Sequence, residues 1–101
     1  MLEATIEDAY VLEAAVVGVQ ALKCEIQGWV NWPDRMNFVK GTQVVFWIEF
    51  KAPGEEPTPG QHHRHSEMRK LGHHVYWCDN FHDAYDMLQL ELLYARTFST
   101  S

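Results

Sequence analysis

Three charged residues stand at places where apolar segments of the chain begin or end. The apolar run VVFWI leads directly into Glu49, and Lys51 follows two residues later. Because side chains alternate between the two faces of a strand, Glu49 and Lys51 should point the same way. Asp34 opens the preceding segment, and a short connection containing Gly41 indicates a hairpin between the two. We therefore expect Asp34 to lie beside Glu49 and Lys51.

Such a triad predicts metal-assisted hydrolysis. Two converging carboxylates repel each other unless a proton or a cation sits between them. Oxygen ligands favour Mg²⁺ or Mn²⁺ over zinc, and the backbone carbonyl of Phe50 adds a third oxygen. Such an ion acidifies bound water and withdraws charge from a phosphoryl oxygen. Lys51 would position or activate the water and stabilise developing charge. The alternative is an exposed Glu49–Lys51 pair of little energetic weight.

Length and composition favour a single globular domain over residues 1–101. The apolar share is 47%, and no apolar run is long enough to cross a membrane. Cys24 and Cys78 are too few and too isolated for a disulfide framework. The acidic start of the chain has the wrong charge for a signal peptide. These features predict a cytoplasmic protein without a membrane partner.

The charge distribution neither supports nor excludes a nucleic-acid partner. The net charge of −6 argues against one. Residues 1–22 carry four acids and no base, whereas residues 35–70 collect six of the eight lysines and arginines. The field at a surface follows local charge more closely than the total, and a bound metal ion would shift it further.

Periodicity and turn residues predict the elements that must position the triad. The expected elements, in chain order, are a helix over 3–22, strands over 22–26, 36–39 and 43–50, a helix over 59–71, a strand over 75–78 and a helix from 79 or 80 to about 94. Gly18 either lowers the stability of the first helix from within or marks the end of that helix. Thr58 is the expected cap of the second helix, which starts at Pro59. The tail 97–101 is expected to fray.

Several motifs in this order resemble the virus-type replication-repair nuclease (VRR-NUC) domain of the PD-(D/E)XK nucleases. They are "PD" at 33–34, "IEFKAPGEEPTPGQ" at 48–61 and "MRKLGHHVYWCD" at 68–79. The resemblance covers nearly the whole chain. It implies an α/β (α+β), restriction-endonuclease-like core, with a central mixed sheet flanked by helices. Asn31 departs from the family pattern, which usually has glycine there, so the conformation of this loop is open.

The resemblance also implies roles for individual residues. Asp34 and Glu49 become metal ligands and Lys51 the catalytic lysine. Gln61 matches a glutamine that the family places beside the active site, and Lys23 matches a basic position that would contact DNA. The family adds a glutamate from the first helix as a further metal ligand. This glutamate is Glu7 by its distance from Lys23, with Glu3 as the reserve.

The function implied is a Mg²⁺- or Mn²⁺-dependent DNA endonuclease that leaves 5′-phosphate and 3′-hydroxyl ends. Stand-alone domains of this size resemble phage or prophage proteins, which act in the cytoplasm of a bacterial host. A homodimer cutting four-way (Holliday) junctions or related branched DNA is expected, without an organic cofactor. The alternatives are a non-catalytic DNA- or protein-binding module on the same scaffold, and a nuclease for flap DNA, ordinary duplex or RNA.

Other candidates have plainer explanations. The histidines of "HHRH" at 62–65 are more simply a solvated helix face, or a contact with phosphate, than a zinc site. Arg64 and Arg69 are candidates for the DNA backbone or for ordinary solvation. Trp29 and Trp32 suit core or dimer packing better than stacking on an unpaired base. The remaining apolar candidates are Trp47 and Trp77, expected in the core, and the stripe Leu88, Leu92 and Leu93, expected in the core or at a dimer interface.

Overall fold

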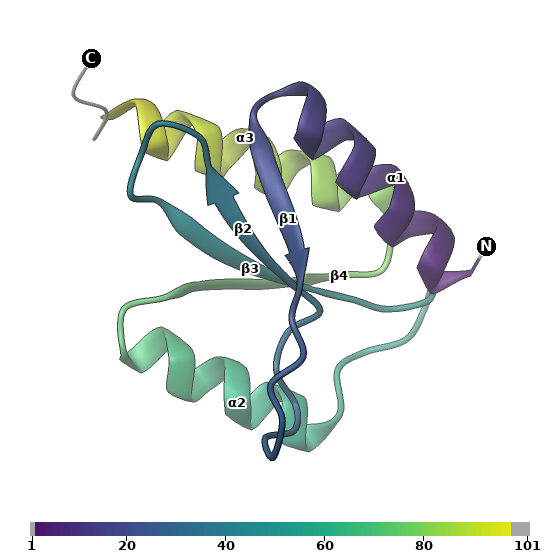
Figure 1. The fold of residues 1–101 in the computed structure, drawn as a ribbon. Coiled ribbons are helices and arrows are strands. Elements are labelled where there is room, and N and C mark those ends of the chain that lie inside the picture. The colour runs from purple at the N-terminus through teal and green to yellow at the C-terminus, as the bar shows by residue number, and fades with distance from the viewer. Residues whose placement is uncertain (1, 98–101) are drawn as a thin grey trace.

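The computed structural model describes residues 2–97 and contains three helices and four strands. The elements are α1 (Glu3–Val16), β1 (Val19–Lys23), β2 (Arg35–Val39), β3 (Val45–Phe50), α2 (Pro59–Lys70), β4 (His74–Cys78) and α3 (Phe81–Thr97) (Figure 1). This order and the α+β fold class confirm the predictions. Of the tail expected to fray, Thr97 ends α3 and residues 98–101 lie outside the described residues.

The four strands form one mixed sheet in the order β1-β2-β3-β4. The first three strands run antiparallel, and β4 joins β3 in parallel after the crossover through α2. Arg35 pairs with Ile48 in the β2–β3 register. Asp34 precedes Arg35, so the register brings it to the end of β3 where Glu49 lies.

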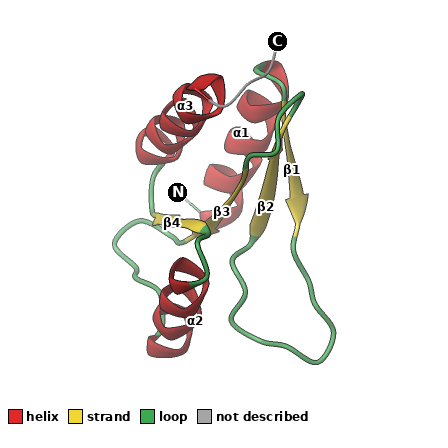
Figure 2. Ribbon diagram, turned by 90° about the vertical axis from the view of Figure 1, so that its left-hand side faces the viewer, coloured by secondary structure: helices red, strands yellow, loops and turns green. Residues whose placement is uncertain are grey.

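Helices cover both faces of the sheet. Helices α1 and α3 lie together on one face and α2 lies on the other (Figure 2). Alternate β3 side chains serve the two layers: Phe46, Ile48 and Phe50 enter the core under α1 and α3, whereas Trp47 packs with the second cluster, which includes Met68 of α2. Glu49 shares the alternation of Trp47 and therefore faces α2.

The boundary between α1 and β1 differs from the prediction. The helix expected to reach residue 22 ends at Val16, and the strand expected over 22–26 occupies Val19–Lys23. Gly18 has a φ of +82°, a left-handed conformation that suits glycine and ends the helix. Pairing with β2, from Val19 opposite Val39 to Lys23 opposite Arg35, fixes the strand register. Tertiary pairing thus overrides the helical propensity of this segment.

The second helix begins as predicted. The Thr58 side chain accepts a hydrogen bond from the Gln61 backbone N–H, and the Gln61 side chain accepts one from the Thr58 N–H, which together form a capping box. Pro59 occupies the first turn, where its missing N–H costs nothing. The helix ends at Lys70, two residues before Gly72 with its φ of +96°.

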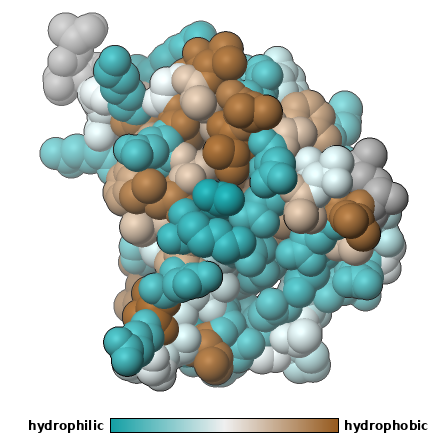
Figure 3. Space-filling view, turned by 45° about the vertical axis from the view of Figure 1, so that its right-hand side comes forward, coloured by the Kyte–Doolittle hydropathy of each residue, from teal (hydrophilic) through white to brown (hydrophobic). Residues whose placement is uncertain are grey.

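Burial of the large apolar residues differs from the prediction at Trp77. Trp47 is buried as expected, but Trp77 is only half-buried, because it faces His62 at the edge of α2. In the stripe on α3, Leu88 is buried and Leu92 is half-buried, whereas Leu93 remains 61% exposed. Figure 3 shows a further gathering of hydrophobic side chains at the top of that view, over α1.

No helix within residues 2–97 has both the length and the apolar character needed to cross a membrane.

Candidate active site

The end of β3 brings Asp34 and Glu49 into contact. Asp34 Oδ2 accepts a hydrogen bond of 2.7 Å from the Phe50 backbone N–H, which ties the residue before β2 to the last residue of β3. The carboxyl groups of Asp34 and Glu49 also lie close enough to share a proton. The hairpin therefore places these two side chains together at one end of the sheet.

The electrostatics of this pair favour a shared proton or a cation. Burial, followed by the charge and hydrogen bond of Glu49, raises the pKa of Asp34 to about 7, although the Phe50 N–H acts in the opposite direction. Burial also raises the pKa of Glu49, against the lowering effects of Asp34 and of the Lys51 ammonium. Without a cation, the pair resists full ionisation at neutral pH.

Two glutamates of α1 approach the same point. One carboxylate oxygen from each of Glu3, Glu7 and Asp34 lies within 4.8 Å of the others. Both glutamates considered for the site thus reach it, and the fold does not choose between them. Burial and the neighbouring Asp34 raise the pKa of Glu3 as well. The cluster now contains four carboxyl groups with Glu49.

Two basic side chains donate hydrogen bonds to Glu7. Its Oε2 accepts hydrogen bonds from Arg35 Nε at 2.6 Å and Lys23 Nζ at 3.2 Å. Arg35 also donates to the Ala21 carbonyl, so its position is fixed by β1. Arg35 was not among the residues predicted for the site. A charged residue directly after Asp34 and inside a short strand was the available signal, because such a charge needs a partner when it is partly buried.

Lys51 follows the last residue of β3 and lies beside the carboxyl groups. Its backbone N–H donates to the Cys78 carbonyl at 2.9 Å, which continues the β3–β4 pairing by one residue. Its ammonium lowers the pKa of both Glu3 and Glu49. Lys51 is half-buried and therefore still in reach of a bound molecule.

This donor set fits a hard divalent cation. All the groups are oxygen ligands, and burial, together with the charges of neighbouring carboxylates, raises the pKa values of Asp34, Glu49 and Glu3. A cation would neutralise the negative charge that these groups concentrate when ionised. Glu49 Oε1 is buried without a hydrogen-bond partner. Asp34, Glu49 and one or both α1 glutamates are the residues that would hold the ion.

The three remaining predicted residues have structural contacts of their own. Gln61 uses its side-chain oxygen in the capping box of α2. Arg69 donates from Nε and Nη2 to the Val75 carbonyl, which anchors the end of α2 to β4. Arg64 lies over the rings of Trp29 and Trp32, at 5.5 and 4.9 Å from their centres. A catalytic role for Gln61 and DNA contacts of the two arginines stay predictions.

The histidine segment of α2 is not a uniform solvated face. His62 and His63 are exposed, but His65 is completely buried, with its Nε2 at 3.4 Å from Glu49 Oε1. The expectation of a solvated face is therefore wrong for His65. Its spacing of three from the buried Met68 was the available signal, since a helix with few apolar residues must still bury one face.

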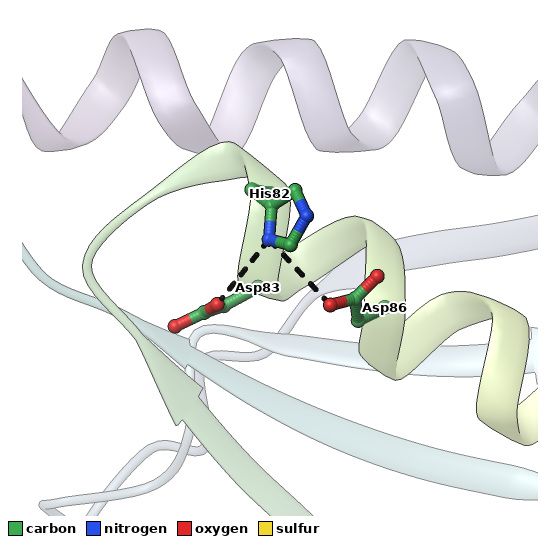
Figure 4. Close-up of side chains that lie close together, drawn as sticks. All are labelled: His82, Asp83 and Asp86. Carbon is green, nitrogen blue, oxygen red and sulfur yellow. Dashed lines mark ion pairs between the residues drawn. The ribbon is translucent and has the colours of Figure 1, made fainter.

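A second acidic cluster lies at the start of α3. His82 Nδ1 is 3.5 Å from Asp86 Oδ2 and 3.7 Å from Asp83 Oδ1, and all three residues are exposed (Figure 4). Neighbours at i, i+1 and i+4 on a helix surface form such pairs routinely and at little energetic gain. The buried cluster around Asp34 is therefore the candidate site.

No family model matches this chain, but a curated protein and a solved structure are similar to it. "Putative nuclease p44" of Acyrthosiphon pisum secondary endosymbiont phage 1 is 37% identical over 78 residues, which cover 77% of this chain and 83% of that protein. A solved structure described as "VRR_NUC domain" superposes with a TM-score of 0.79 at 20% identity, over 86% of this chain and 94% of that one.

The fold is thus that of a VRR-NUC domain, with a carboxylate cluster at the end of its central hairpin. The chain belongs to the same family as the phage-encoded "Putative nuclease p44", and its fold supports a stand-alone VRR-NUC domain.

Proposed function

We propose that this protein is a Mg²⁺- or Mn²⁺-dependent endonuclease that hydrolyses phosphodiester bonds in DNA. The observation that carries the proposal is the contact between Asp34 and Glu49 beside Lys51, in which burial raises the pKa of both acids and the charge of Glu49 raises the pKa of Asp34 further. Such crowding is costly in a binding module and useful around a catalytic cation. It therefore favours the enzyme over the non-catalytic alternative.

Each residue of the proposed active site has a distinct role. Asp34, Glu49 and a glutamate of α1 hold the cation, and the Phe50 N–H fixes the Asp34 carboxylate in place. When bound, a divalent ion supplies Lewis-acid chemistry: it acidifies water and offsets charge on the phosphate. Lys51 directs its ammonium at the scissile phosphate, orients the attacking water and stabilises the additional negative charge of the transition state. Arg35 and Lys23 orient Glu7 through the hydrogen bonds that they donate to its Oε2.

The loop over residues 24–34 suits a branched substrate. It extends past the end of the sheet (Figures 1 and 2) and leads directly into Asp34. Trp29 is 60% exposed in this loop, so core packing, the simpler expectation, does not apply to it. The Arg64 guanidinium packs on its ring and donates to the Val30 carbonyl, which holds the loop against α2. An exposed ring next to the site is suited to stacking on an unpaired base.

The loop conformation also resolves the departure from the family pattern. Asn31 has a φ of +68°, the left-handed region in which the family's glycine would be unstrained. Asparagine tolerates this region better than other side chains do. The Asn31 side chain fills the space over Gly60, where an added Cβ would lie only 2.7 Å from Asn31 Nδ2. Loop and helix therefore fit each other without the family's glycine.

Replacing Trp29 by alanine should weaken binding to DNA with unpaired bases about tenfold, because one base–aromatic stack is worth about 1–3 kcal/mol. Binding to fully paired duplex should change little. Fluorescence anisotropy with Ca²⁺ in place of Mg²⁺, on a four-way junction and a matched duplex, measures both. Trp29→Phe is the control that retains a ring. An equal loss on both DNAs would contradict a role in recognising branched substrates.

The proposed assembly is a homodimer, which would present two active sites to the two-fold symmetry of a four-way junction. Exposed apolar residues on α1 and α3 support it, among them Val16, which is 80% exposed, and Leu93. Sedimentation velocity of the protein and of a Leu93→Glu variant tests this assembly. A wild type that sediments as a monomer at micromolar concentration would contradict it.

The proposed activity is tested with labelled four-way junction, flap, duplex and single-stranded DNA, each incubated with Mg²⁺, Mn²⁺ or EDTA. Cleavage in Mg²⁺ or Mn²⁺ and none in EDTA is expected, with the junction or another branched substrate cut fastest. The products should carry 5′-phosphate ends that a phosphatase removes. DNA binding without cleavage of any substrate would favour the non-catalytic module. The phage-encoded relative supports the cytoplasm of a bacterial host as the proposed site of action.

A further inference from the structure

We propose that His65 is a positioning residue for the metal site: its Nε2–H donates to Glu49 Oε1 and turns the other carboxylate oxygen toward Asp34 and the cation. This inference rests on the proposed function. It concerns a residue of α2 that lies outside the Asp34, Glu49 and Lys51 set.

The burial of the pair is the first observation. His65 is completely buried and Glu49 is 2% exposed, so water does not replace the interactions that these side chains lack. Glu49 Oε1 and both ring nitrogens of His65 are buried without a hydrogen-bond partner, while Nε2 and Oε1 face each other at 3.4 Å. A buried polar group without a partner costs about 1–3 kcal/mol. A leucine would fill the position without that cost, which suggests a polar function for the histidine.

The second observation is the hydrogen-bonding capacity of the ring. A neutral imidazole carries one N–H donor and one acceptor nitrogen. With the hydrogen on Nε2, the ring has its donor 3.4 Å from Glu49 Oε1, and a small movement of either side chain would complete a hydrogen bond. The neutral ring adds a donor without adding a positive charge that would repel the cation.

The third observation is the way in which the fold fixes the two partners. Glu49 points to the α2 face of β3, and His65 lies in the middle of α2, one turn before the buried Met68. The capping box of Thr58 and Gln61 anchors one end of α2, and Arg69 anchors the other end to β4. Groups that hydrogen-bond a ligating side chain orient it, and their loss typically weakens metal binding about 10–100-fold.

Calorimetric titration of Mn²⁺ into the metal-free protein at pH 7.5 tests the inference without any measurement of activity. We expect His65→Leu to raise the dissociation constant about tenfold or more. The melting temperature of its metal-free form should stay equal or rise, because the substitution removes two unpartnered nitrogens. A merely structural role for His65 predicts the reverse: lower stability with unchanged metal affinity.

Two amide variants make the test specific to one ring nitrogen. The side-chain nitrogen of glutamine reaches the position of Nε2, whereas that of asparagine reaches the position of Nδ1. His65→Gln should therefore restore most of the affinity that His65→Leu loses, and His65→Asn should not. Equal affinities of all three variants and the wild type would overturn the inference alone. Loss of Mn²⁺ binding with Mg²⁺ binding unchanged would also overturn it, since that result makes His65 a direct ligand.

Glu49→Gln separates this inference from the function on which it rests. It should abolish the Mn²⁺ heat seen with the wild type. If the wild type binds no Mn²⁺, or Glu49→Gln binds it as well as the wild type does, the proposed function fails and the inference fails with it. If the wild type binds through Glu49 and the His65 variants match it, only the role of His65 is wrong.

Discussion

Replacing Lys51 by alanine should reduce the rate of DNA cleavage about 10²–10³-fold, the loss seen when one donor to a developing negative charge is removed. Mn²⁺ binding should persist and even tighten slightly. The reason is that the Lys51 ammonium lowers the pKa of Glu49 and Glu3, so that it competes with the cation for the same negative charge. Single-turnover cleavage rates and calorimetric titration of the same preparation measure the two effects.

Lys40→Ala is the matched control for this variant. Lys40 is exposed at the β2–β3 turn, the opposite end of the hairpin from Lys51, so the same change in charge and side-chain length should leave cleavage unaltered. A Lys51→Ala protein that cuts as fast as the wild type would mean that the activity comes from another site or from a contaminating nuclease.

Asp34→Asn should stabilise the metal-free protein at neutral pH while abolishing cleavage. Because the folded-state pKa of Asp34 is about 7 and its ordinary value is 3.8, ionisation is harder in the folded state. Its contribution to stability is therefore complete below about pH 4 and is lost as the pH rises through 7. Allowing for solvent screening, we expect the variant to melt roughly 4–8 °C above the wild type at pH 8 in EDTA.

The difference between the two melting curves is the quantity to follow. The pKa of His65 is lowered from 6.5 to about 4, so its contribution has the opposite sign: it is present above pH 6.5 and lost as the pH falls through 4. The two effects oppose each other between about pH 4 and 6.5 in the wild type. Subtracting the curves cancels His65, and the gap should widen from pH 4 to pH 8. A gap that is constant or absent would contradict the raised pKa of Asp34.

Saturating Mn²⁺ should make the wild type melt at a higher temperature than Asp34→Asn. A ligand that binds only the folded state stabilises it by about 2.7 kcal/mol at one hundred times its dissociation constant. The wild type would gain that stability at pH 8, and Asp34→Asn would not, because its amide replaces a charged ligand. If saturating Mn²⁺ leaves the melting temperature of the wild type unchanged, the carboxylate cluster does not bind the ion.

The sequence predicts the centre of the site because local rules control it. Strand alternation places Glu49 and Lys51 on one side, and a hairpin turn at Gly41 returns the chain so that Asp34 lies opposite. Cap chemistry at Thr58 similarly predicts where α2 begins. Each of these features depends on a few neighbouring residues, so a single sequence carries the signal.

The missed features depend on partners distant in the chain. The register of β1 is set by pairing with β2, so its start three residues upstream of Leu22 could not follow from local propensity. Arg35 meets Glu7 across 28 positions, and His65 meets Glu49 across the interface between α2 and the sheet. Trp29 is exposed because its loop leaves the sheet, which composition does not reveal.

The most direct test of the account is an anomalous difference map, collected above the manganese absorption edge, from a crystal soaked in Mn²⁺. The account predicts a strong peak between the carboxylates of Asp34 and Glu49, within ligand distance of a glutamate of α1. A peak only at the exposed His82, Asp83 and Asp86 cluster, or none at saturating Mn²⁺, would contradict it.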